Sequence, residues 1–565
     1  MNDKDFILNN SFGVYHKRPE IPSYVSDLSL SKALISHVCP LLNKHHNIDY
    51  PYSYWITLLL PSTQIWIENV FDRFQIDFDI DSLPYVRHTE LLNCSALELL
   101  NYKLLKDIYC FQTHSSVDSD DLFIQNRSLP KNSDPIYYKS SLNHQLIKRR
   151  LLKLFSPRFL EIISYRIRLF KRHLYCLFWM VSKKRHNGYI LQQIFIAKEF
   201  NDLLKKLKSR DIHPLLEGRL PSLLVRSQDF SFFRTLNLNF LYESDNQEII
   251  EFISSYFTKY LPSYALEEFD SYFNYYKDFS CNTLICKCPA SLESSFRHIF
   301  ASLSLQKNKI ITFQHGGTFI GDLDKALERI EVEFSDIYVS WRDDADAGTR
   351  GLVTGYNVNK SLNENLNNHD HDVLIIAPNF KRFHRYNIGI HPFDNKRVAK
   401  RIIDLITLLL AKGLNVMYRP YGQTQDLVSS HFGFKTSTER IEKQINSSRQ
   451  IIICKPTTTV TECLIQGKIP ILFFSHEENI SNELAISLSE LAKFGFYASD
   501  VESCNELITA NPVKSQSPHE LNLVKQLFDA LFGANLGTVE DVLDVIDNPV
   551  ESYSTPYNII HNLRV

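Results

Sequence analysis

The sequence contains no pair of cysteines at the spacing that binds zinc. Its ten cysteines are scattered, no two of them have two residues between them, and Cys286 and Cys288 have one. A single residue is too few for the usual zinc geometry, so we expect neither a zinc site nor a disulfide framework. Reduced thiols, which are typical of a cytoplasmic protein, are the expectation instead.

Net charge, long apolar runs and glycine are also in short supply. The formal net charge is −2, which gives no argument for nucleic acid binding by the chain as a whole. No apolar run approaches the roughly 18 residues of a membrane span, and residues 1–5 contain no apolar signal-peptide core. Glycine numbers 17, whereas 44% of the residues are hydrophobic, which argues against wholesale disorder. A chain of 565 residues with this composition predicts two or three globular domains.

Residues 1–110 predict a helical extension. Apolar residues recur at helical spacing between 28 and 42, and an aromatic, apolar stretch with a charged end follows at 52–73. A buried helical pair is the favoured interpretation. A substrate-facing role for Trp55 or Arg73 is the alternative.

A strongly basic segment lies at 148–185. It holds twelve lysines and arginines and one acid, Glu161, with apolar residues at helical spacing between the charges. An interfacial helix needs this pattern, because its apolar face enters the headgroup region while its cations meet anionic lipid. The segment therefore predicts peripheral binding at the inner face of the cytoplasmic membrane. A core helix with a solvated basic face is the alternative, and we expect no nucleic acid partner because no recognition module accompanies the charge.

Apolar strands and amphipathic helices alternate from about residue 190 onward. Within 111–335, strand signals lie at 223–225, 283–285 and 309–312, with a helix at 291–305. Within 336–530, strand signals lie at 336–341, 353–356, 373–378, 414–421, 450–454 and 469–474, and helices at 397–412, 457–465 and 517–532. The last helix opens with Ser517 and Glu520 as a capping box. This alternation predicts two doubly wound parallel domains in series, followed by a C-terminal helix and tail at 531–565.

The loop after the strand at 309–312 carries the first candidate site, with the residues Gln314, His315, Gly316 and Gly317. Ligands of open α/β sheets bind at the carboxyl ends of strands, and glycine lets a ligand lie against the backbone. The His315 imidazole can donate a hydrogen bond to a phosphate or move a proton. A tight turn with a solvated histidine is the alternative.

A second polar group stands where the strand at 450–454 gives way to a helix, and it comprises Lys455, Thr457, Thr458, Thr459 and Glu462. A helix N-terminus presents unpaired N–H groups and a partial positive charge, which suit a phosphate. Threonine hydroxyls and Lys455 add donors, and Glu462 can accept from ribose hydroxyls. The alternative is that Thr459 and Glu462 form a structural capping box.

Arg419 is the third candidate. It ends the apolar strand at 414–418 and precedes Pro420, which ends the strand. An arginine in this place can hold a phosphate in a bidentate manner. Three loops at strand ends, two in one domain and one in the other, are expected to converge on an interdomain cleft.

The order of these motifs resembles that of GT-B glycosyltransferases, and more narrowly that of transferases encoded in bacterial surface-glycan gene clusters. The motifs are the segment from Tyr54-Trp55 to Asp72-Arg73, QHGG at 314–317, the strand with Trp341, Val-Thr-Gly at 353–355, Tyr-Arg-Pro at 418–420, and the stretch from Lys455 to Pro470. The resemblance extends over residues 50–530. It implies two Rossmann-like domains that face a cleft, with the acceptor on the N-terminal side and a nucleotide-sugar donor held by the C-terminal domain.

Site roles follow from the resemblance. Thr458, Thr459 and Glu462 would hold the nucleotide, Arg419 would face its phosphate, and Gln314, His315 and Gly316 would face the reacting sugar. The resemblance also implies no cofactor and no obligatory metal, because a helix dipole, arginine and hydroxyls stabilise the leaving phosphate.

Two departures leave the donor open among CMP-, UDP- and GDP-linked sugars, with a CMP-activated acidic sugar as the first guess. Related transferases of acidic sugars carry His-Pro where this chain has Arg419-Pro420, and polyol-phosphate transferases carry His-Gly-Thr where it has His-Gly-Gly at 315–317. The predicted function is sugar transfer to a surface polysaccharide, glycolipid or flagellar glycan. The alternatives are a polyol-phosphate transferase or sugar-nucleotide epimerase of the same fold, and a non-catalytic glycan- or membrane-binding scaffold. The general base is His315 or an acid of the N-terminal half such as Glu243.

Overall fold

The structure is a computed structural model of the chain, and it describes residues 14–15, 22–77, 187–191, 200–215, 231–276, 279–287, 294–306, 308–313, 326–340, 350–351, 353–354, 370–378, 395–420, 427–434, 439–455, 458–475, 482–510, 517–532 and 536–537, with isolated positions at 104–112, 543 and 547. The basic segment at 148–185 and the predicted strand at 223–225 lie outside these residues. Within the described part, no helix is long and apolar enough to cross a membrane.

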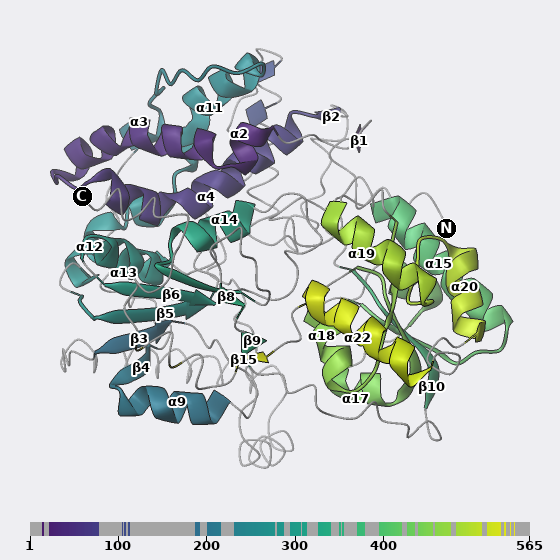
Figure 1. Ribbon diagram of the computed structural model, residues 1–565. Helices are drawn as coiled ribbons and strands as arrows, with labels where there is room; N and C mark the ends of the chain where they lie inside the picture. Colours follow the sequence, from purple (N-terminus) through teal and green to yellow (C-terminus); the bar gives the residue numbers. More distant parts are fainter. Residues whose placement is uncertain are drawn as a thin grey trace, which may run out of the picture.

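Two parallel sheets, each packed against helices, form two units that Figure 1 shows side by side. The predicted parallel α/β architecture with a helical N-terminal part is confirmed. The domain limits and the cleft between the domains stay predictions.

The first unit contains a six-stranded parallel sheet. Its strand order is β4-β3-β5-β6-β7-β8, and the strands are β3 (Gly188–Leu191), β4 (Ile212–Leu215), β5 (Thr283–Lys287), β6 (Lys309–Phe313), β7 (Ile337–Ser340) and β8 (Arg350–Gly351). Ile311 pairs with Ile285 on one side and with Ile337 on the other, and all three are buried. Short apolar runs rich in β-branched residues therefore form the buried strands that the sequence predicts at 283–285 and 309–312.

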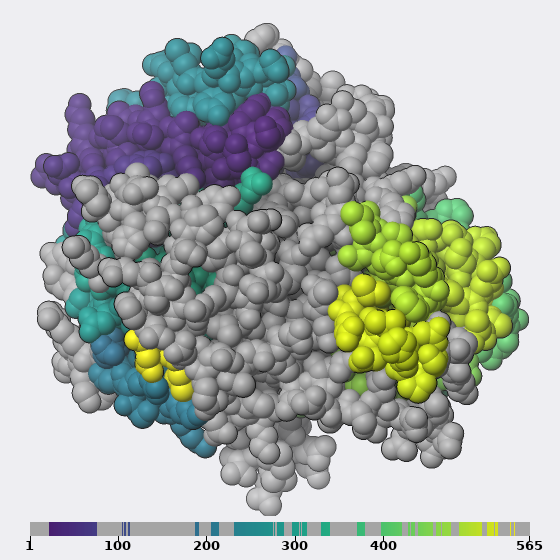
Figure 2. All heavy atoms as spheres, in the orientation of Figure 1, coloured from purple at the N-terminus to yellow at the C-terminus, as the bar shows by residue number. Residues whose placement is uncertain are grey.

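Helices from the N-terminus share the core of this first unit. α3 (Ser29–His46) packs on α4 (Tyr52–Arg73), and α4 in turn packs on α11 (Gln247–Tyr260), α13 (Ser294–Ser304) and α14 (Ala326–Glu333). One hydrophobic cluster runs from Val25 through Trp55 to Leu284 of β5 and Ile310 of β6. The predicted buried helical pair is thus confirmed, and Figure 2 shows the purple N-terminal helices at the top of the view with the teal segment around α11 over them.

The remaining elements of this unit are short or connect the others. They are β1 (Val14–Tyr15), which pairs antiparallel with β2 (Ile76–Asp77), and α2 (Ser23–Ser26), α9 (Phe200–Ser209), α10 (Ser231–Arg234), a 3-10 helix at Ser263–Ala265 and α12 (Phe269–Tyr276).

The second unit contains a five-stranded parallel sheet of the order β11-β10-β12-β13-β14. The strands are β10 (His371–Ile376), β11 (Val416–Arg419), β12 (Ser448–Ile453), β13 (Ile471–Phe473) and β14 (Tyr497–Ala498). The helices are α15 (Asn395–Ala411), α16 (Leu427–Phe432), α17 (Ile441–Asn446), α18 (Thr458–Ile465), α19 (Asn482–Lys493), α20 (Val501–Ala510) and α22 (Pro518–Phe532).

Helices cover both faces of this second sheet, which explains its continuously apolar strands. On β10, Leu374 and Ile376 join a core with α18, α19 and α22, whereas Val373 and Ile375 join a core with α15 and α20. Successive residues of a strand point to opposite faces, so both faces need apolar side chains. In Figure 2, α19 and α22 lie side by side on the visible face.

The chain returns to the first unit after α22. β15 (Leu536–Gly537) pairs in parallel with β9 (Val353–Thr354). Further on, the Asp547 carboxylate accepts two hydrogen bonds from Nε of Arg210 at 2.9 and 3.1 Å and one from Nη2 at 2.7 Å. Arg210 lies between α9 and β4, so the C-terminal segment is fastened beside the first sheet.

Candidate functional site

The strand that leads to the predicted catalytic loop lies inside the first sheet. β6 pairs with β5 and β7, and Phe313 is its last residue. Gln314, His315, Gly316 and Gly317 follow directly and lie outside the described residues. Because β6 is parallel to its neighbours, the chain leaves it at the carboxyl edge of the sheet, where ligands of such folds bind. The roles of these four residues stay predictions.

The second sheet has a topological switch point at β10. β11 lies on one side of β10 and β12 on the other, and the following strands continue on the β12 side. Ligands of open α/β sheets bind outside the carboxyl ends of the strands at such a point. The register places Arg419 beside Ile376 and Ile376 beside Ile453, so the ends of β11 and β12 lie about 10 Å apart across β10. Arg419 and the residues that enter α18 therefore border one edge, as the sequence predicts.

One end of the Arg419 guanidinium is fixed by α17 and by the segment just before it. Its Nη1 group donates to the backbone carbonyl of Glu439 at 3.2 Å and to Oε1 of Gln444. These bonds use both Nη1 protons, and no described residue accepts from Nε or Nη2. The Nε–Nη2 edge is the one that binds a phosphate or carboxylate through two parallel hydrogen bonds.

Glu462 lies in the second turn of α18, and its carboxyl interacts electrostatically with Arg419. The pKa of its carboxyl is raised to about 7, chiefly by burial and also by the negative charge of Glu442, while the positive charge of Arg419 opposes the rise. Burial lowers the pKa of Arg419, which Glu462 and Glu442 in turn raise. Within the described part of the chain the Glu462 carboxyl forms no hydrogen bond and no ion pair shorter than 4.0 Å. The two groups therefore influence each other without contact.

The predicted phosphate-binding residues surround the start of α18. Lys455 stands two residues after the end of β12, the helix begins at Thr458, and Thr459 is half-buried in its first turn. Thr457 and the side chain of Thr458 lie outside the described residues. Because the Glu462 carboxyl makes no hydrogen bond within the described part, it does not close a capping box with Thr459. The structural alternative for this carboxyl is therefore wrong.

A comparison with protein families decides the class of the chain. The model of the LIC12162 family transferases matches residues 22–511. The chain belongs to this family. It is thus a transferase, and the resemblance to a transferase family that the motifs indicate is confirmed.

Comparisons with single proteins add little to this assignment. No curated protein sequence matches this transferase. Among solved structures it matches the glycosyltransferase SnogD from Streptomyces nogalater at 10% identity and a TM-score of 0.31, over 64% of this chain and 100% of that one. It matches the spinosyn forosaminyltransferase SpnP at 9% identity and a TM-score of 0.25, over 67% of this chain and 98% of that one. Similarity at these scores carries no argument.

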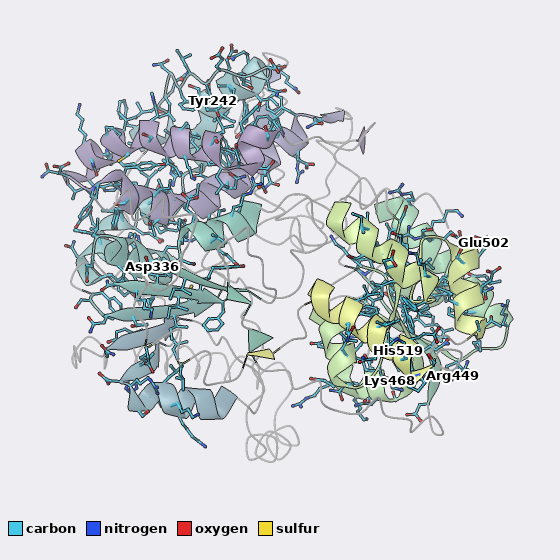
Figure 3. The ribbon with its side chains drawn as sticks, in the orientation of Figure 1. Tyr242, Asp336, Arg449, Lys468, Glu502 and His519 are labelled. Atoms are coloured by element: carbon cyan, nitrogen blue, oxygen red, sulfur yellow. The ribbon has the colours of Figure 1, made fainter. Side chains whose placement is uncertain are left out.

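Three residues that the sequence offered as alternatives lie in α4 or just before α11 of this transferase. Trp55 is fully buried, stacks on Phe269 with 5.3 Å between ring centroids, and donates from Nε1 to Oδ1 of Asn43 at 2.7 Å, so it belongs to the core. Glu243 is exposed in the segment before α11, next to Tyr242, which Figure 3 places in the top layer. Arg73 is fully buried beside Asp72 and donates to Asn69 at 3.3 Å, at the end of α4.

Lys468 belongs to the stretch from Lys455 to Pro470 that the resemblance includes. It lies at the amino edge of the second sheet, opposite to the edge that carries Arg419. Its Nζ donates to the backbone carbonyl of Ser448, the first residue of β12, at 3.2 Å (Figure 3). It therefore closes the C-terminal end of α18 against the sheet and is separate from Arg419.

Sequence reasoning missed α17 altogether. Glu439, Glu442 and Gln444 act on Arg419 and Glu462, yet the segment has no motif, and only the contact of Gln444 with Arg419 reveals its part in the site.

Proposed function

We propose that this transferase moves a sugar from a nucleotide-sugar donor to a glycan or lipid acceptor, with the donor held at the carboxyl edge of the second sheet. The observation that carries the proposal is the Arg419 guanidinium, one end of which is fixed while its Nε–Nη2 edge is unused within the described part of the chain. Across the switch point stands Glu462, a largely buried carboxyl without a hydrogen bond there.

These groups match the two polar parts of a nucleotide. The Nε–Nη2 edge suits a phosphate, and the N-terminus of α18 adds unpaired N–H groups and a partial positive charge. Glu462 is suited to bind the ribose hydroxyls. We propose Arg419, Lys455, Thr457, Thr458 and Thr459 as the groups that stabilise the leaving phosphate, which would make a bound metal unnecessary.

We place the chemical step at the loop after β6. His315 is the proposed general base, with Gln314, Gly316 and Gly317 against the reacting sugar. A surface polysaccharide, glycolipid or flagellar glycan is the proposed acceptor, and a CMP-activated acidic sugar is the first donor to try. His315→Ala should abolish transfer and leave the unfolding midpoint unchanged. Transfer by that variant at the wild-type rate would exclude His315 as the base.

A thermal-shift screen against CMP, CDP, UDP, GDP and dTDP tests the donor site. A ligand at 100 times its Kd stabilises the folded state by about 2.7 kcal/mol, or roughly 5–10 °C for a unit of about 200 residues. We expect a rise with one nucleotide class, lost in Glu462→Ala and Arg419→Met and retained in Glu490→Ala, a control on the exposed surface of α19. A rise that survives in both site variants would place the nucleotide elsewhere. No rise with any nucleotide would favour the scaffold alternative.

Association with an anionic membrane surface is a separate proposal, supported by the basic segment at 148–185. Sedimentation with phosphatidylserine vesicles should show a bound fraction at low salt that falls as salt rises. The absence of a bound fraction at low ionic strength would refute it.

A further inference from the structure

Gln444 is an unusual residue for the centre of a short helix. Its side chain is fully buried, at 0% exposure, and its Oε1 accepts a hydrogen bond from Nη1 of Arg419. Its backbone carbonyl accepts from Oγ of Ser448 at 2.8 Å, which fastens α17 to the start of β12. Its Nε2 group, in contrast, is buried and has no hydrogen-bond partner within the described part of the chain. A buried amide group without a partner costs free energy, so folding stability does not explain why a glutamine stands here.

The chemistry of the amide explains it better. A guanidinium on a long side chain loses rotamer freedom when it binds a ligand, and a fixed guanidinium has already lost that freedom. A carboxylate in the place of Gln444 would also fix Arg419, but it would neutralise the charge that attracts an anion. Glu442 and Glu462 already act on Arg419 with negative charge. A neutral oxygen fixes the guanidinium and leaves its positive charge for the ligand.

We infer that Gln444 is a positioning residue for the donor phosphate, which it serves by holding Nη1 of Arg419 so that the Nε–Nη2 edge stays available. The inference rests on the proposed function, since it needs an anion at Arg419. Gln444 thereby joins the site as a residue of α17 that orients Arg419 and does not touch the ligand.

The test is a double-mutant cycle measured by calorimetric titration with inorganic pyrophosphate and with the nucleotide that the thermal-shift screen selects. The variants are Gln444→Met, Arg419→Met and the pair together. Methionine keeps the length of glutamine and removes the oxygen. We expect Gln444→Met to weaken binding of pyrophosphate about tenfold, as for the loss of one orienting charged hydrogen bond. In the Arg419→Met background the same change should have no effect, because Gln444 acts only through Arg419.

Gln450→Met is the matched control. Gln450 is a glutamine in the amino half of β12, away from the carboxyl edge, and it is also buried. Its Nε2 donates to the carbonyl of Ile508 at 3.1 Å, and it pairs with Val373 of β10. This control should lower the unfolding midpoint and leave the affinity for pyrophosphate unchanged. Gln444→Met should do the reverse, with an unchanged or higher midpoint and lower affinity. Gln444→Glu should fold at least as well as wild type and also bind pyrophosphate more weakly, because the added charge neutralises Arg419.

The outcomes separate the inference from the function it rests on. If the wild type binds pyrophosphate or a nucleotide and Gln444→Met binds equally well, the role of Gln444 is refuted and the donor site stands. Additive losses in the double variant, or an equal loss in Gln450→Met, would likewise refute it. A wild type that binds neither probe would overturn both the donor site and this inference.

Discussion

Replacing Glu462 by glutamine should stabilise the unliganded protein at high pH while it weakens donor binding. The pKa of this carboxyl is raised from 4.5 to about 7, chiefly by burial, so folding disfavours the carboxylate. Its contribution to stability is intact below the unfolded pKa of 4.5 and is lost as the pH rises through 7. The difference of roughly 2.5 pKa units corresponds to ~3 kcal/mol that the ionised form costs the folded state. Glutamine has the same shape and no charge.

Urea unfolding of wild type and Glu462→Gln at pH 5, 6, 7 and 8 measures this cost. The unfolding free energy of the variant minus that of the wild type should increase by about 2–3 kcal/mol from pH 5 to pH 8. Glu490→Gln, on the exposed surface of α19, should show no such trend. A difference that does not change with pH, or a variant less stable than wild type at pH 8, would refute the assignment of Glu462 as a buried acid. A residue that costs stability in this way is typical of a functional site.

Three further predictions concern the frame of the molecule. The pKa of His46 is lowered to about 4, chiefly by burial, so its stabilising contribution is present above pH 6.5 and is lost as the pH falls through 4. The unfolding free energy of the wild type minus that of His46→Gln should therefore fall by about 3 kcal/mol between pH 7 and pH 4 in urea unfolding, and a difference that does not change with pH would contradict this. Ser517→Ala should lower the stability of the second unit by about 1 kcal/mol in urea unfolding, because it removes half of a capping box. In that box, Glu520 N–H donates to the Ser517 hydroxyl at 3.3 Å, and the Glu520 carboxylate accepts from Ser517 N–H at 2.7 Å. An unchanged midpoint would contradict the role of this cap. Arg210→Met should release the C-terminal segment, because it removes the ion pair with Asp547. Proteolytic removal of residues beyond 532 should then be faster, while the free energy of unfolding changes by less than about 1 kcal/mol. Equal cleavage rates would show that this ion pair does not hold the segment.

The central strands were predictable because both faces of each sheet are buried, whereas β3, β4 and β14 were not predicted. The run at 373–378 is continuously apolar, and the structure uses its alternate residues in two different cores. The same physics applies at 309–312 and 450–454, and periodicity along the chain suffices for it. The capping box at Ser517 and Glu520 was predictable for a similar reason, since its two partners are three residues apart.

Contacts between distant segments were not predictable in this way. Arg419 could be proposed because it stands at a strand end, and Glu462 because it lies near the start of the helix that follows a strand, but α17 carries no signal that a distant arginine uses Gln444 as its acceptor. The shared core of the N-terminal helices with β5 and β6, and the return of the chain to Arg210, depend equally on tertiary packing. The capping-box interpretation of Thr459 and Glu462 failed because helix α18 begins before Thr459, so spacing alone gave the wrong N-terminus.

The position of the donor is the central claim, and hydrogen exchange with mass spectrometry tests it most directly. Exchange is measured with and without the nucleotide that the thermal-shift screen selects. A bound nucleotide should protect amides at 416–419, 439–446 and 454–465, because these segments contain Arg419, the helix that fixes it, and the start of α18. Protection of these three segments in wild type, and its loss in Arg419→Met, is the predicted result. Protection confined to the first unit, with unchanged exchange at the end of β11 and in α18, would contradict the account.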